Sequence, residues 1–234
     1  MSFEKDWRDD AKRAAVGQAL KRIRDGHIVG LGSGSTAAYA IRELGKRIAT
    51  EGLNILGIPT SYQSMFLAIE SGIKLTTLNE NPEIDIAIDG ADQVSRDLNL
   101  IKGGGAALTR EKIIDSAAKD LLIVVDETKI AEILDHPVPL EIFPIALQTT
   151  SKRIQQLGGK PILRQSLGKA GPVITDNNNF IIDVDFGVIK EPGSLENKLK
   201  MIPGIVETGL FLDMAKEVYV GRKNAVHVLR KGIV

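Results

Sequence analysis

Helix-type and strand-type patterns of apolar residues alternate along the first half of the chain. Apolar positions three and four residues apart predict helices over residues 11–24, 35–49, 63–71 and 106–118. Short apolar runs between them predict buried strands over residues 27–31, 53–58, 73–75, 84–88 and 121–125. Regular alternation of strand and helix indicates a parallel sheet with crossover helices. We therefore expect an α/β fold: a Rossmann-like, mostly parallel sheet with helices on both faces.

The pattern changes near residue 136, where simple alternation stops. Residues 136–204 predict an inserted α+β domain, with helices over 151–157 and 194–201 and a hairpin that pairs 173–175 with 180–184. Strand patterns return at residues 205–206, 217–221 and 225–229, and we expect these strands to rejoin the first sheet. The predicted domains are therefore residues 1–135 with 205–234, and residues 136–204.

Polar, turn-forming residues follow four of the predicted strands, at residues 32–36, 59–61, 89–92 and 126–129. In open α/β sheets, ligands bind beside the carboxyl ends of the strands. We therefore expect the binding site at this edge of the sheet.

Composition excludes several classes of protein. The chain has 234 residues, and its 30 basic and 30 acidic side chains cancel, so no overall charge favours nucleic acid or an anionic membrane. Cysteine is absent, which excludes a disulfide framework, a thiolate nucleophile and a zinc site built on sulfur. The charged start is unlike a secretory signal, and no apolar run is long enough to span a bilayer. We expect a cytoplasmic protein.

The glycine-rich turn at residues 30–36 resembles a dinucleotide-binding fingerprint, but its spacing differs. Ser35 occupies the sixth position, where the fingerprint requires glycine or alanine, and the second strand does not end in an acidic residue. Backbone N–H groups at a helix N-terminus, together with hydroxyls of Ser33, Ser35 and Thr36, fit a single phosphate instead. The alternative is an ordinary turn in which Ser35 or Thr36 caps the helix.

Asp89 and Asp92 follow a buried strand directly, three residues apart. Two carboxylates so placed can accept hydrogen bonds from sugar hydroxyls or bind a divalent metal. A metal is disfavoured, because no histidine or second acidic cluster stands nearby in the sequence. The alternative is an acidic turn that caps the next helix or faces solvent.

Lys102 precedes three consecutive glycines, and Glu111 follows within the next predicted helix. Three glycines in a row are entropically costly and mark a close approach of the backbone to another group. A lysine, free N–H groups and a carboxylate together suit proton transfer on a small polar substrate. The alternatives are a solvated lysine in a flexible loop and a glutamate that pairs with a neighbouring residue on its helix.

Lys129 stands at the fourth polar strand end, and it is either an exposed residue at the start of a helix or a ligand of a phosphate. The three histidines, His27, His136 and His227, are far apart and match no ligand spacing, so we interpret them as structural.

Four motifs occur in the order and spacing found in the ribose-5-phosphate isomerase type A family. They are Gly-Ser-Gly-Ser-Thr at residues 32–36, Asp-Gly-Ala-Asp at 89–92, Lys-Gly-Gly-Gly at 102–105 and Thr-Arg-Glu-Lys at 109–112. The inserted segment, at residues 157–159, 175–177, 202–204 and 209–211, resembles that family's lid and oligomerisation domain. The resemblance covers essentially the whole chain.

The resemblance implies a role for each motif. It implies that Glu111 is the base that transfers the proton. It also implies that the phosphorylated sugar is held by Ser33, Gly34, Ser35, Thr36 and Lys129, that Asp89, Gly90, Ala91 and Asp92 line the substrate, and that Lys102, Gly103, Gly104 and Gly105 do so beside the reacting carbons. Lys102 and the glycine N–H groups would stabilise an oxyanion, while Asp89 and Asp92 would orient hydroxyls and assist opening of the sugar ring.

Two positions depart from the family's pattern. Ser33 replaces a threonine common in the family, which keeps the hydroxyl, and Gln93 replaces an acid, which removes a charge beside Asp92. Lys12 and Arg13 are two candidates for an N-terminal basic residue near the phosphate.

The implied activity is the interconversion of D-ribose 5-phosphate and D-ribulose 5-phosphate through an enediolate, in the non-oxidative pentose phosphate pathway. This chemistry requires no cofactor or metal, and we expect a homodimer or homotetramer with no nucleic-acid or membrane partner. One alternative is a non-catalytic sugar-phosphate-sensing domain, although the residues before the first helix leave no room for a DNA-reading domain. Another is a different phosphosugar isomerase or a lactonase of the same fold, which the two carboxylates and the glycine loop disfavour.

Overall fold

The computed structural model describes residues 7–168 and 170–231. The chain forms two compact units. The large unit comprises Met1–Ala91, Ile113–Ile130 and Met214–Val234, and the small unit comprises Asp92–Lys112 and Ala131–Asp213. Within the described ranges, none of the helices has the length and apolar content needed to cross a membrane.

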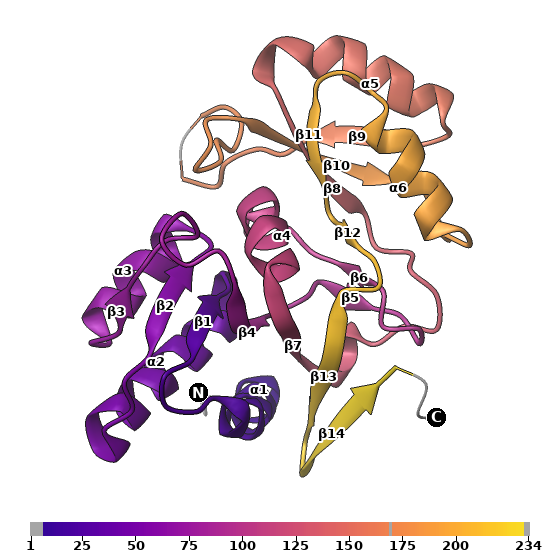
Figure 1. Cartoon of the computed structure of the whole chain (residues 1–234). Helices are drawn as coiled ribbons and strands as arrows, with labels where there is room; N and C mark the ends of the chain where they lie inside the picture. Colours follow the sequence, from indigo (N-terminus) through magenta and orange to yellow (C-terminus); the bar gives the residue numbers. More distant parts are fainter. Residues whose placement is uncertain (1–6, 169, 232–234) are drawn as a thin grey trace, which may run out of the picture. The chain divides into compact units, whose positions relative to one another are not determined.

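A seven-stranded sheet organises the large unit, in the order β14-β13-β7-β4-β1-β2-β3 (Figure 1). The strands are β1 (Ile28–Leu31), β2 (Leu56–Pro59), β3 (Lys74–Leu75), β4 (Ile84–Asp89), β7 (Ala118–Asp126), β13 (Ala215–Arg222) and β14 (Ala225–Arg230). Neighbouring strands are parallel except β13 and β14, which form an antiparallel pair. The predicted mostly parallel sheet is therefore confirmed.

Helices cover both faces of this sheet. One face packs against α1 (Trp7–Ala19), α2 (Gly34–Glu51) and α3 (Tyr62–Glu70), and a short 3-10 turn, η1 (Leu20–Arg22), extends α1. Val29 and Leu31 of β1 belong to this buried cluster. On the other face, Ile58 of β2 packs with Ile114, which lies in α4 (Leu108–Ser116). Because side chains alternate along a strand, β1 presents Gly30 to this second face, close to Ile114.

Local sequence explains where these helices begin and end. Ser61 and Ser64 form a reciprocal capping box at the start of α3, in which each side chain bonds the other residue's backbone N–H. Gly52 ends α2 in the left-handed conformation, with φ of 72°, and its N–H donates to the carbonyl of Ile48.

The small unit contains a four-stranded sheet in the order β11-β8-β10-β9. Its strands are β8 (Val138–Ile142), β9 (Lys160–Leu163), β10 (Phe180–Asp185) and β11 (Ile205–Thr208). The helices α5 (Leu147–Gln156) and α6 (Pro192–Lys200) contribute Ile154 and Leu199 to a core that includes Leu140 and Ile182 of the sheet. A short 3-10 turn, η3 (Pro144–Ala146), precedes α5.

A second, three-stranded sheet of the small unit carries the segment around Lys102. Its order is β12-β6-β5, formed by β12 (Leu210–Phe211), β6 (Leu100–Ile101) and β5 (Gln93–Val94). All neighbouring strands are antiparallel. The helix α4 begins in the small unit and ends in the large unit.

The predicted hairpin of residues 173–175 and 180–184 is present only as a turn and one bridge, not as a pair of strands. β10 pairs with β8 and β9, and only an isolated bridge joins Ile174 to Phe180. The turn itself exists, because the N–H of Thr175 donates to the carbonyl of Asn179. Two Asn side chains of this loop bind a buried carboxylate of β8, so the loop folds over the sheet rather than extending it.

The prediction for the C-terminal strands is correct for two strands and wrong for the first. β13 and β14 join the large sheet, whereas β11 pairs with β8 of the small unit. The sequence patterns did not predict the short strands β5, β6 and β12, or β8 and β9. The compact units also place residues 92–112, 131–135 and 205–213 in the small unit, whereas the predicted domains placed them with the larger one.

Candidate active site

The predicted site residues divide between the two units, and each set is described by itself. The large unit contains Ser33, Gly34, Ser35, Thr36, Asp89, Gly90, Ala91 and Lys129, and the small unit contains Asp92, Lys102, Gly103, Gly104, Gly105 and Glu111.

The turn between β1 and α2 presents the N-terminus of an 18-residue helix. Ser33 occupies the N-cap position with extended backbone, which corrects the alternative that Ser35 or Thr36 is the cap. Its hydroxyl does not cap the helix but bonds the hydroxyls of Thr60 (2.7 Å) and Ser61 (2.6 Å). The first-turn N–H groups, including those of Ser35 and Thr36, have no acceptor within the helix. This end of α2 therefore attracts an anion.

Asp89 ties the end of β4 to this turn. Its carboxylate is 1% exposed, and Oδ1 accepts hydrogen bonds from the N–H groups of Ser33 (3.3 Å) and Gly90 (2.7 Å). A side chain at Gly32 would place its Cβ 2.2 Å from Cγ of Asp89, so only glycine fits there. Gly90 lies close to Thr36, because a Cβ added to Gly90 would be 3.6 Å from Cβ of Thr36.

This contact occurs where the order of strands reverses. The chain runs from β1 outward to β2 and β3, and β4 then pairs with the opposite side of β1. A crevice at such a switch point is the usual ligand site of an open α/β sheet. Within the large unit, the polar ends of β1 and β4 therefore meet through the contact of Asp89 with Ser33.

Basic side chains gather at the end of β7. Lys129 ends the 3-10 turn η2 (Glu127–Lys129), and it makes no hydrogen bond or ion pair with the residues that the structure describes. Nearby, Nζ of Lys12 lies 3.5 Å from Oδ2 of Asp126, a buried carboxylate that also caps the turn through the N–H of Thr128. Arg13 instead stacks on Tyr39, with Cζ 4.4 Å from the ring centroid.

The small unit holds Lys102 and Glu111 as a buried ion pair. Lys102 Nζ lies 3.2 Å from Oε2 of Glu111, and the side chains are 2% and 5% exposed. Glu111 stands in the first turn of α4, and Lys102 follows β6 directly. The Lys102 ammonium also lies 5.1 Å from the ring centroid of Phe211, as does that of Lys112 at 5.0 Å. Cations at this distance from an aromatic face are attracted to it.

The glycine loop after Lys102 encloses the carboxylate of Asp92. The N–H of Gly104 donates to Oδ2 of Asp92 at 2.7 Å. A Cβ at Gly104 would lie 2.6 Å from the other carboxylate oxygen, so glycine is required for this approach. Lys102 is fixed in turn, because its N–H donates to the carbonyl of Gly209 at 2.9 Å.

Gln93 supplies a side-chain N–H donor, which an ionised acid at its position would lack. Its Oε1 accepts hydrogen bonds from the N–H groups of Asp135 (2.8 Å) and His136 (2.9 Å), and its Nε2 donates to Oδ1 of Asp135 (2.6 Å). A carboxylate here would accept the two N–H groups but would repel Asp135. The departure from the family's pattern is thus matched by the local structure.

Several residues of the site were missed by sequence reasoning. Thr60, Ser61 and Gln63 bond the turn at residues 32–36, since the hydroxyls of Thr60 and Ser61 contact that of Ser33 and Oε1 of Gln63 accepts from the N–H of Gly34 at 2.9 Å. Phe211 lies beneath two ammonium groups. The polar strand end at residues 59–61 was the available signal for the first group; for Phe211, no spacing in the sequence indicated a cation contact.

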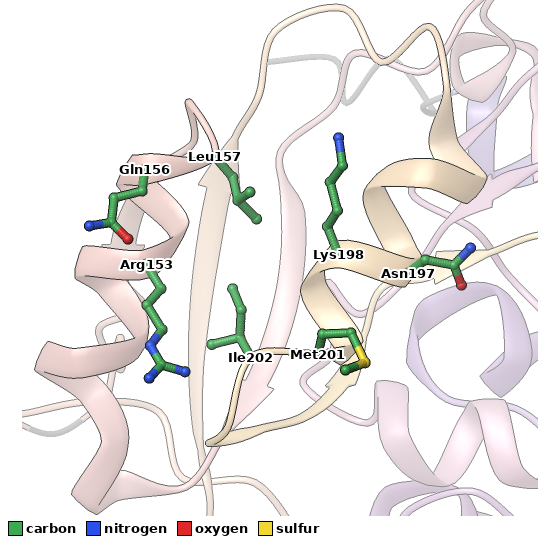
Figure 2. A pocket seen from close by; sticks show the side chains of 7 residues that line it. All are labelled: Arg153, Gln156, Leu157, Asn197, Lys198, Met201 and Ile202. Carbon is green, nitrogen blue, oxygen red and sulfur yellow. The ribbon is translucent and has the colours of Figure 1, made fainter.

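A groove between α5 and α6 contains none of these residues. Figure 2 shows its lining, which is formed by Arg153, Gln156, Leu157, Asn197, Lys198, Met201 and Ile202. It offers apolar side chains and two cations but no carboxylate. It therefore has no group suited to accept a proton from a sugar carbon.

Comparison with known proteins identifies the family. The family model for ribose 5-phosphate isomerase A (phosphoriboisomerase A) matches residues 56–225. Ribose-5-phosphate isomerase A of Methanosarcina acetivorans is 54% identical over 213 residues, which cover 91% of each chain. The protein of the same description from Methanothermobacter thermautotrophicus is 50% identical over 220 residues, which cover 94% of this chain and 97% of its own.

Solved structures that resemble this chain indicate the same family. The structure of ribose 5-phosphate isomerase A from Methanocaldococcus jannaschii matches with a TM-score of 0.92 and 44% identity, over 95% of this chain and 99% of that chain. A D-ribose-5-phosphate isomerase in complex with phospho-erythronic acid matches with a TM-score of 0.93 and 44% identity, over the same shares.

The mostly parallel sheet and its match to these solved isomerases place the chain in the class of α/β phosphosugar-isomerase folds. The family model covers more than half of the chain, and relatives about 50% identical cover nearly all of it. The chain belongs to the ribose-5-phosphate isomerase A family. The resemblance predicted from the four motifs is therefore confirmed.

Proposed function

We infer that the chain catalyses the interconversion of D-ribose 5-phosphate and D-ribulose 5-phosphate. Family membership supports the reaction, and the single observation that carries the chemistry is the buried pair of Lys102 and Glu111. It brings an anionic proton acceptor and a cation together with little access for water.

Glu111 is the proposed base. Isomerisation removes the proton from the carbon next to the aldehyde of the open-chain sugar and returns it to the aldehyde carbon, through an enediolate. One carboxylate on one face of the sugar performs both transfers. Glu111 suits this role because it is buried in the first turn of α4 beside Lys102.

Lys102 is the proposed oxyanion-stabilising group. Negative charge moves onto the carbonyl oxygen as the proton leaves, and a fixed ammonium stabilises that charge without reorganising. The position of Lys102 is fixed by the hydrogen bond of its N–H to Gly209 and by the ring of Phe211. Loop N–H groups near Gly105 would add further donors.

The N-terminus of α2 and Lys129 are the proposed phosphate-binding groups. The N–H groups and hydroxyls of Ser35 and Thr36 suit this role better than the hydroxyl of Ser33, which already bonds Thr60 and Ser61. Of the two N-terminal candidates, we propose Lys12, because its ammonium lies at Asp126, three residues before Lys129, whereas Arg13 stacks on Tyr39.

Asp92 and Asp89 are proposed to have different roles. Asp92 is half-buried and accepts one N–H, so its carboxylate retains capacity to orient a sugar hydroxyl or assist ring opening. Asp89 is buried and holds the turn at Ser33 and Gly90, so its main contribution is to shape the site.

The test is an assay for ribulose 5-phosphate formation from ribose 5-phosphate, run with and without a chelator. The Glu111→Gln variant should retain binding of phospho-erythronic acid, measured by calorimetry, and lose turnover by a factor of about a thousand or more. Retained turnover in that variant would exclude Glu111 as the base. Activity lost on chelation would overturn the proposal that no metal takes part.

Two controls separate this activity from the alternatives. A panel of other aldose phosphates and sugar lactones tests for a different isomerase or a lactonase. Binding of ribose 5-phosphate without turnover by the wild-type chain would indicate a sensing domain. A homodimer or homotetramer and a cytoplasmic location stay predictions, for which sedimentation and cell fractionation are the tests.

A further inference from the structure

We propose that Arg164 is a positioning residue that aims the N–H of Gly105 at the reacting end of the substrate. This proposal rests on the proposed function, because the loop it concerns follows the proposed oxyanion-stabilising residue, Lys102. Its basis is a set of contacts within the small unit that no predicted role explains.

Arg164 is held from both sides by rigid structure. It follows β9 directly, its N–H donates to the carbonyl of Ile181, and its carbonyl accepts from the N–H of Val173, both at 2.9 Å. Its guanidinium forms a bidentate salt bridge with Asp183 of β10. In this salt bridge Nε donates to Oδ2 at 2.8 Å and Nη2 donates to Oδ1. The side chain is 18% exposed. A planar guanidinium paired in this way has a fixed direction.

The remaining donor of the guanidinium binds the glycine loop. Nη1 donates to the carbonyl oxygens of both Gly103 (2.8 Å) and Gly104 (3.0 Å). Two successive carbonyls of the glycine loop thus accept from one atom of the side chain, and that of Gly103 also accepts from the N–H of Ala106 at 3.0 Å. Glycine loses more conformational freedom than any other residue on ordering, so a glycine loop needs such external contacts to keep one conformation.

Holding a carbonyl also fixes the N–H of the next residue, because the two groups share a planar trans peptide and point in opposite directions. The peptide between Gly103 and Gly104 is held at both ends, since its carbonyl accepts from Arg164 and its N–H donates to Asp92. The carbonyl of Gly104 is held in the same way, so the N–H of Gly105 points away from Arg164.

The N–H of Gly105 is the group left available. Among the residues that the structure describes, none accepts a hydrogen bond from it, whereas Asp92 already accepts that of Gly104. The space beside Gly105 is open, because no atom lies within 4 Å of an added Cβ, and the residue is exposed. A fixed, unused donor three residues from Lys102 is suited to bind an oxyanion.

The experiment compares Arg164→Lys with a matched control, Arg153→Lys, in the groove of Figure 2. Lysine keeps the charge and can pair with Asp183, but it lacks the planar fork needed to hold two carbonyls as well. We expect Arg164→Lys to lower kcat by about tenfold to a hundredfold, the effect of misplacing a catalytic donor by about 1 Å, with KM changed by less than about threefold. Arg153→Lys should match the wild type.

Two measurements distinguish positioning of the glycine loop by Arg164 from a general contribution of Arg164 to the stability of the fold. Deuterium uptake by a peptide spanning residues 102–107 should rise in Arg164→Lys, while uptake in β13 stays at the wild-type level. In an Arg164→Ala variant, added guanidinium should restore part of kcat, and added ammonium should not. A wild-type kcat in Arg164→Lys, or equal increases in exchange across the whole chain, would overturn the proposal.

Failure of the proposed function is distinguishable from failure of this inference. If the wild-type chain does not isomerise ribose 5-phosphate, the proposed function fails, whatever the exchange data show. If the wild type is active and exchange at residues 102–107 is unchanged in Arg164→Lys, only the inference about Arg164 fails.

Discussion

Nζ of Lys102 lies 3.2 Å from Oε2 of Glu111, and neither side chain is more than 5% exposed. Two opposite charges in such a place depend on each other, because removal of one deprives the other of its buried counter-charge. The same pair is therefore both the proposed chemical centre and a point of vulnerability in the fold.

Replacing Lys102 should test this dependence. We expect Lys102→Met to destabilise the protein by about 3–5 kcal/mol, because the Glu111 carboxylate stays buried. The double variant Lys102→Met/Glu111→Gln should recover most of that loss and remain inactive. Urea unfolding of the two single variants and the double variant measures the coupling, and strictly additive losses would show that the residues are independent.

Replacing Gly32 by any larger residue is expected to lower both stability and substrate affinity. Gly32→Ala places Cβ 2.2 Å from Cγ of Asp89, so the turn at residues 32–36, where we propose that phosphate binds, must shift. Such overpacking typically costs about 1–3 kcal/mol, and the shifted turn should raise KM for ribose 5-phosphate. The matched control is Gly17→Ala in α1, which has open space and should be neutral or stabilising. Steady-state kinetics and thermal unfolding of both variants are the measurements.

Lys129 should act on affinity and not on stability. Loss of one charge-assisted contact to phosphate, about 1.5–3 kcal/mol, corresponds to a rise in KM of about tenfold to a hundredfold in Lys129→Gln. The exposed Lys74, replaced in the same way, serves as the control. Inhibition by inorganic phosphate should weaken in parallel. If the inhibition constant is unchanged, Lys129 does not bind the phosphate.

Glu217 of β13 should make stability depend on acid pH. Burial alone would raise the pKa of this carboxyl, but hydrogen bonds from Tyr219 and Arg230 and the charge of Arg22 outweigh it, and the pKa lies below its usual value. A carboxyl with a lowered folded-state pKa stabilises the fold above its unfolded-state pKa of about 4.5, and this contribution is lost as the pH falls through the folded value.

The expected result is a pH-dependent difference between the wild type and Glu217→Gln. The free energies of unfolding should differ most near pH 7 and converge as the pH is lowered from about 4.5 toward 3. Urea titrations at several pH values give the comparison. A difference that stays constant from pH 7 to pH 3 would contradict the assignment.

Gln93→Glu should weaken the turn at Asp135 and His136. The carboxylate would still accept the two N–H groups, but it would face Oδ1 of Asp135, now 2.6 Å from Nε2. We expect a loss of about 1 kcal/mol at pH 7, which should shrink as the new carboxyl is protonated near pH 4. Equal stability of the two proteins at pH 7 would argue against this account.

The sequence predicted the large sheet well because its signals are local. The strands β1, β4 and β7 are apolar runs bounded by turns, and the mostly buried strand β13 carries the same signal. The small unit was predicted less well. β5, β6 and β12 are two residues long, too short for any pattern, and β10 finds its partners in segments that precede it by about twenty residues or more.

The candidate site shows the same division. Glycine turns and polar strand ends are visible in sequence, and they located Ser33, Asp89, Lys102 and Glu111. The contacts that keep these groups in place are not visible in the sequence. Arg164, for example, bonds Gly103 across a separation of 61 residues, and no periodicity links the two. Sequence patterns thus indicate which groups are candidates for the chemistry, whereas tertiary structure is needed to show what keeps them in place.

By its burial alone, Phe211 would be classed as an ordinary apolar core residue, since its side chain is fully buried. Yet its ring faces two ammonium groups, one paired with Glu111 and one with Glu196 and Glu207. A leucine would keep the position apolar, though smaller, and would remove the negative face of the ring from both cations. A designer who judged this position by volume and hydrophobicity alone would keep the fold and change the electrostatics of the site.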